Sequence, residues 1–100
     1  MFGGGDGRDD ARQKTQQLLL YAKCHAERTG EREVNSLNPL AEYAVGGERA
    51  LIGPWGQRFQ FQYVEDKQAE HKLLVVWTVN PRSGKKIGSP EELLKEVDKK

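Results

Sequence analysis

Apolar and polar residues alternate in a way that predicts two β-strands in the second half of the chain. Phe59, Phe61 and Tyr63 alternate with glutamines, which is the pattern of a strand with one buried face. Residues 73–79, LLVVWTV, are almost all apolar and rich in β-branched side chains. A run of this kind favours a central strand that is covered on both sides.

A hairpin centred near Gln68 would join these strands into an antiparallel pair. It would place every aromatic side chain of the two strands on one face of the sheet. The pairs in this register are Phe59 with Trp77, Phe61 with Val75, and Tyr63 with Leu73. A turn at residues 80–84, NPRSG, leads to a third strand that has Ile87 on the Trp77 face. The sequence thus predicts a three-stranded antiparallel meander with an apolar face that needs a cover.

A long helix is predicted over residues 9–29. An aspartate can cap its start, and Gly30 is a typical stop signal. Apolar and small residues recur in it every three or four positions. These residues are Ala11, Thr15, Leu18, Leu19, Ala22 and Ala26. We expect this stripe to cover the sheet face that holds Phe61 and Trp77.

Two shorter helices are also predicted. The first begins at Asn38, which is followed by proline, and directs Leu40 and Tyr43 toward the sheet. The second begins at Ser89, which can form a capping box with Glu92. A helix this short is stable only if it packs on the rest of the protein.

Length and composition fit one small α+β domain. The chain has 100 residues, of which 36% are hydrophobic, enough for a single small core. Residues 1–8 are glycine-rich and predict a flexible N-terminus. Residues 9–100 predict one domain, in which the long N-terminal helix packs on the meander and short helices complete the fold.

A turn with a large aromatic ring, Pro54-Trp55-Gly56, precedes the first strand in the sequence GPWGQRFQF. Upstream lies the helical sequence LLLYAKCHAERTG. Together these resemble the soluble part of the major pseudopilin of type II secretion systems, in which an Asp-Pro-Trp-Gly turn precedes an aromatic strand. The resemblance covers about residues 11–87 and is most specific at the turn, Phe59 and Phe61. This chain departs from the family in having Gly53 before the proline, and Glu31 where a Tyr-Pro pair usually begins.

The resemblance implies a structural subunit and not an enzyme. Its partners would be copies of itself in a periplasmic pseudopilus, together with other components of the secretion system. In the family, the long helix continues from a membrane-spanning helix, which implies a membrane-anchored periplasmic protein. If Met1 is the native start, we expect a cytoplasmic domain instead. The chain as given lacks the membrane-spanning segment, so we expect it to be monomeric at micromolar concentration.

Many members of the resembled family bind calcium in the loop after the last strands. Calcium requires six to eight oxygen ligands. The corresponding residues 80–86, NPRSGKK, contain three cations and no carboxylate. We therefore expect no calcium site, with the C-terminal helix clamping that edge of the sheet instead.

Candidate catalytic and metal-binding residues are few. Cys24 and His25 are adjacent on the predicted helix, so their side chains point about 100° apart. A single cysteine excludes an intramolecular disulfide and a cysteine-based zinc site. His25 and His71 lack the spacing of a histidine metal site. We predict no catalytic, cofactor or metal residue and no small-molecule substrate.

Two alternatives to the secretion role remain. One is a free-standing protein-interaction module with the same fold. The other is a nucleic-acid binder that uses the basic turn with Lys85 and Lys86 beside the aromatic strand. The formal net charge is only +1, and the aromatics are needed for the core, so we expect no nucleic-acid binding. We also expect Trp55 to close the core at the end of the sheet and not to serve as an exposed recognition ring.

Overall fold

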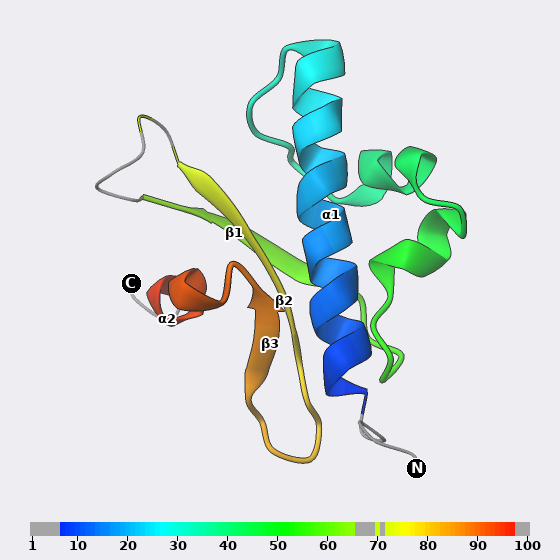
Figure 1. Ribbon diagram of the computed structural model, residues 1–100, viewed down its shortest axis with the longest axis vertical. Helices are drawn as coiled ribbons and strands as arrows, with labels where there is room; N and C mark the ends of the chain where they lie inside the picture. The colour runs from blue at the N-terminus through cyan, green and yellow to red at the C-terminus, as the bar shows by residue number, and fades with distance from the viewer. Residues whose placement is uncertain (1–6, 66–69, 71, 98–100) are drawn as a thin grey trace.

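The computed structural model describes residues 7–65, 70 and 72–97. A long helix, α1 (Arg8–Thr29), packs on a three-stranded antiparallel sheet in the order β1-β2-β3 (Figure 1). The strands are β1 (Gln60–Val64), β2 (Leu73–Val79) and β3 (Lys86–Ser89). Short helices η1 (Asn38–Tyr43) and η2 (Gly47–Leu51) precede the sheet, and η3 (Glu91–Leu93) and α2 (Leu94–Val97) follow it. The α+β fold predicted from the sequence is confirmed.

Both ends of α1 are formed by glycines in the left-handed conformation. Gly30 has φ 80° and its N–H donates to the carbonyl of Ala26 at 2.8 Å, so the predicted stop is confirmed. At the other end Gly7, with φ 85°, is the cap residue and no side chain caps the helix. The predicted aspartate cap is wrong, because both aspartates lie inside the first turn. Their negative charge is favourable there beside the unpaired N–H groups.

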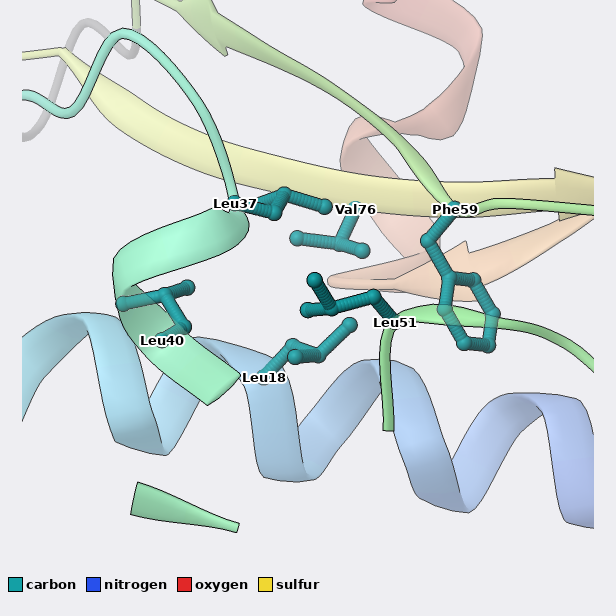
Figure 2. Close-up of a cluster of buried hydrophobic side chains, with 6 residues drawn as sticks. All are labelled: Leu18, Leu37, Leu40, Leu51, Phe59 and Val76. Atoms are coloured by element: carbon teal, nitrogen blue, oxygen red, sulfur yellow. The ribbon is translucent and has the colours of Figure 1, made fainter. Parts of the chain in front are cut away.

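The buried face of α1 is the predicted stripe. Ala11, Thr15 and Leu18 are fully buried, and the helix packs against β2 and β3. Figure 2 shows Leu18 of α1 in a cluster of buried side chains that point toward one another. Its other members are Leu37, Leu40, Leu51, Phe59 and Val76.

The pairing of β1 with β2 differs from the predicted register by one residue. Phe61 lies opposite Val76 and not Val75, and Gln60 lies opposite Trp77. Because side chains alternate across a strand, this shift moves Trp77 to the face opposite Phe61. The hairpin closes with Val64 opposite a leucine at position 73, so the midpoint of the connector falls between positions 68 and 69. The prediction that Trp77 and Phe61 share the face under α1 is therefore wrong.

The turn between β2 and β3 forms as predicted. Asn80 donates its N–H to the carbonyl of Lys85 at 3.0 Å and accepts from the N–H of Gly84 at 2.7 Å. Its side-chain oxygen accepts from the N–H of Arg82 at 2.9 Å. Gly84 has φ 72°, a conformation that glycine adopts without strain.

Beyond this turn, Ile87 of β3 lies on the α1 side of the sheet as predicted, but Trp77 does not share that face. Ile87 lies opposite Thr78, so it faces α1 and not the Trp77 side. Ser89, the predicted helix cap, is instead the last residue of β3. Its hydroxyl is buried and lies 3.0 Å from the hydroxyl of Thr15 on α1. No side chain caps η3, so the predicted capping box with Glu92 is wrong.

The second face of the sheet is covered by the C-terminal helical segment. Trp77 and Val75 are buried there with Val64. The side chains that pack against them include Leu93, Leu94 and Val97. The central strand is thus covered on both sides, as its continuous apolar run predicts. On the Trp77 side the cover is the short C-terminal helical segment. Its packing on the sheet provides the support that so short a helix needs to be stable.

Thr78→Val should raise the free energy of unfolding by about 1 kcal/mol. Thr78 is 1% exposed, and in the described part of the chain its hydroxyl has no hydrogen-bond partner. Valine has nearly the same shape without that unsatisfied group. Thr15→Val is the matched control, because the Thr15 hydroxyl donates to the carbonyl of Arg12 at 2.7 Å and contacts Ser89. The control should lose about 1–3 kcal/mol. Urea unfolding of both variants measures the difference, and a destabilised Thr78→Val would contradict the prediction.

Candidate functional site

The Pro54-Trp55-Gly56 segment forms a closed turn immediately before β1. The N–H of Gly56 donates to the carbonyl of Gly53 at 3.1 Å, and the N–H of Gly53 donates to the carbonyl of Gln57 at 2.7 Å. Gly56 has φ 81°, which explains why glycine follows the tryptophan. Beyond the turn, the N–H of Phe59 donates to the carbonyl of Leu51 at 2.9 Å. The turn is therefore tied to both flanking segments.

This turn lies against the beginning of α1. A methyl group built on Gly7 would lie 3.1 Å from Cβ of Pro54 and 3.6 Å from Nε1 of Trp55. Trp55 is half-buried and belongs to neither cluster of core side chains. Its ring thus lies beside the start of the helix. The motif that carries the family resemblance packs against the N-terminal end of α1.

The other singled-out residues do not gather at this turn. Phe59 is buried in the cluster beneath α1. Phe61 is half-buried and meets the ring of Tyr63 edge to face, with centroids 6.4 Å apart. Trp77 is buried on the other side of the sheet. Phe59 and Trp77 are core residues, so neither ring is available for stacking on a base.

The histidine on α1 makes a structural contact. His25 Nδ1 lies 3.3 Å from the hydroxyl of Tyr43, and Tyr43 stacks on Tyr21 with ring centroids 6.5 Å apart. Tyr43 was predicted to face the sheet, but these contacts attach η1 to α1 instead. Cys24 is exposed.

Candidate metal ligands are scattered. Among the described residues, no group of three or more His, Cys, Asp or Glu side chains is placed to hold a metal ion. His71 lies outside the described residues. Absence of calcium binding by the β2–β3 loop stays a prediction.

One titratable side chain ties the loop after α1 to the sheet. The hydroxyl of Tyr63 accepts a hydrogen bond from the N–H of Val34 at 2.8 Å. Burial raises the pKa of Tyr63, while this hydrogen bond lowers the same pKa and the charge of Glu33 raises it. The hydroxyl is neutral at physiological pH, as for an ordinary tyrosine, and the contact with Val34 holds the loop against β1.

A groove lies between α1 and the segment that links η1 to η2. It has a volume of about 380 Å³ and is open to solvent. Figure 1 shows α1 running between the sheet and these short helices. The side chains that line the groove include Lys14, Gln17, Tyr21, Val45, Arg49 and Ala50.

Sequence reasoning missed this groove. Its two walls come from segments far apart in the chain, and no motif joins them. One local signal was present, because Val45 is an apolar residue directly before the Gly46-Gly47 pair. A valine at such a break in regular structure is a candidate for an exposed apolar contact. In the structure Val45 is fully exposed.

Comparison with known proteins identifies no relative. No family model matches the sequence, and neither the characterised proteins nor the solved structures contain a significant match. Within the part of the chain that the structure describes, no helix combines the length and apolar character needed to cross a bilayer.

Proposed function

We propose that this protein is a structural subunit of the pseudopilin type, which acts through its surfaces in a secretion assembly and performs no covalent chemistry. The observation that carries the proposal is the packing of the Pro54-Trp55-Gly56 turn against Gly7 at the start of α1. In the resembled family, this end of the helix continues toward the membrane. A rigid turn at that position would fix the direction in which the helix leaves the domain.

The outer face of α1 supports the same role. One side of the helix is buried in the domain, and the other side is exposed along its length. This outer face, as we name it, includes Gln13, Gln16, Leu20, Lys23, Cys24 and Glu27. Leu20 is 58% exposed, although burial of a leucine is worth about 2 kcal/mol. A neighbouring subunit packed along the outer face would bury this side chain.

Cross-linking in cells that carry the native gene tests this proposal. Cys24 is the single cysteine of the chain and lies on the outer face. A short bismaleimide added to intact cells should give a covalent dimer, and Cys24→Ser should abolish it. Leu20→Glu should strongly reduce the dimer by placing a charge in the contact.

Two controls make the result interpretable. Leu20→Glu should change the free energy of unfolding by less than about 0.5 kcal/mol because it is a surface substitution. Arg82→Glu, in the exposed β2–β3 turn, should leave cross-linking unchanged. An exclusively monomeric, uncross-linked protein in the cytosolic fraction would overturn the proposal and favour the free-standing interaction module.

A further inference from the structure

We propose that the groove between α1 and the η1–η2 segment binds an acidic segment of a partner protein that also carries an apolar side chain. A free-standing domain and a subunit of a polymer would both present this groove. The groove uses Lys14, Gln17 and Tyr21 of α1, none of which belongs to the outer face. It is therefore a surface distinct from the outer face.

Two cations line the groove. Arg49 is exposed, and in the described part of the chain its guanidinium makes no hydrogen bond or ion pair. A guanidinium offers a planar fork of donors that matches a carboxylate. Lys14 lies on the other wall, where its ammonium is 3.6 Å from Oδ2 of Asp10 and 3.5 Å from the carbonyl of Ile52. An incoming carboxylate would meet the unpaired guanidinium of Arg49 and the ammonium of Lys14.

Uncharged donors also line the groove. Gln17 and Tyr21 project from α1 into the same groove, and their side chains can donate to further oxygen atoms of a bound peptide. The acidic groups nearest in sequence to the cations are Asp10, which is paired with Lys14, and Glu48 at the start of η2. Neither of these carboxylates lines the groove. The lining is therefore cationic and complementary to an acidic segment.

An apolar wall accompanies the charged one. Val45 is fully exposed and lines the groove together with Ala50. The groove therefore offers a small apolar contact beside its two cations. A groove of about 380 Å³ that is open to solvent cannot enclose a ligand, but it can accept one or two side chains of an extended segment.

The walls of the groove are held in place before binding. Tyr21 stacks on Tyr43 of η1, and Tyr43 also contacts His25. Backbone N–H groups of Gly47 and Arg49 donate to the carbonyls of Ala44 and Gly46 at 3.2 and 3.3 Å. Binding to such a preformed surface costs less conformational entropy than binding to a flexible loop.

Fluorescence anisotropy with the full chain tests the proposal. The probe is a fluorescein-labelled peptide of alternating glutamate and leucine, compared with a peptide of alternating lysine and leucine. We expect saturable binding of the acidic peptide, weakened by salt, and no binding of the basic one. Arg49→Gln should weaken binding about tenfold or more, the effect of removing a hydrogen bond to a charged group. Val45→Ser should also weaken it, and Arg82→Gln, in the exposed β2–β3 turn, should not.

Several outcomes would overturn this assignment. They are no saturable binding of the acidic peptide, equal binding of both peptides, or unchanged affinity in Arg49→Gln. Sedimentation equilibrium tests a second copy as the occupant, and a dimer that Arg49→Gln dissociates would also overturn the assignment. Failure of any of these tests leaves cross-linking through Cys24 unaffected, so the two proposals can fail separately.

Discussion

Trp77→Ala should lower the free energy of unfolding by about 3–5 kcal/mol. The ring is 6% exposed and lies in a cluster with Val64 and Val75, against which α2 packs. A small domain has a total stability of about 5–15 kcal/mol, so this substitution is expected to leave a large unfolded fraction near physiological temperature. The loss can be measured by urea unfolding.

The region that loses stability should differ between substitutions on the two faces of the sheet. In a variant that remains folded, such as the milder Trp77→Leu, hydrogen exchange should accelerate first in residues 91–97, which pack beside Trp77. Leu18→Ala, in the cluster beneath α1, should accelerate exchange in α1 instead. A loss below about 1 kcal/mol in Trp77→Ala would show that the ring is not a core residue.

Local sequence signals predicted most elements of the fold. The stop of α1 at Gly30 and the turn at Asn80 each depend on residues within a few positions. Helical spacing in α1 likewise reported its buried face, because a helix that covers a sheet needs a continuous apolar stripe. These features could be predicted because each is determined within one short segment.

The strand register could not be predicted because β2 is apolar on both faces. Val75 and Val76 are both fully buried, so either valine could face α1 without an energetic penalty visible in the sequence. A strand with one polar face would have fixed the register. The missing information was the cover on the second face, which is α2 with Leu94 and Val97. A C-terminal helix was predicted, but α2 has only four residues, too few for its apolar pattern to show on which face of the sheet it docks.

The candidate site was predictable only in part. The turn at Pro54 and Trp55 was visible as a motif, but its contact with Gly7 joins residues more than forty positions apart. The groove with Lys14 and Arg49 is likewise formed by tertiary packing of α1 against the short helices. Such sites carry no signal in a single sequence unless a motif marks both sides.

Gly88→Ala is expected to destabilise the protein by at least about 3 kcal/mol, at the upper end of the cost of overpacking. Gly88 lies opposite Trp77 in the pairing of β2 with β3. A methyl group built on it would clash with the carbonyl oxygen of Val76 and lie 2.7 Å from Cα and Cβ of Trp77. The backbone of β2 or β3 would have to move, which would break their ladder of hydrogen bonds.

Two variants establish that the cause is this close approach of strands. Gly46→Ala is the matched control, because its nearest contact would be an ordinary 3.5 Å to Cβ of Arg49 and its φ is −85°. The control should be neutral or stabilised by up to about 1 kcal/mol.

The second variant is Trp77→Leu, which removes the indole ring. It cannot relieve the clash, since the Val76 carbonyl and Cβ at position 77 both remain. Gly88→Ala should therefore be no better tolerated in the Trp77→Leu background than in the wild type. Rescue in that background would place the obstruction on the indole ring, and an unchanged urea midpoint in Gly88→Ala alone would refute the close approach of β2 and β3.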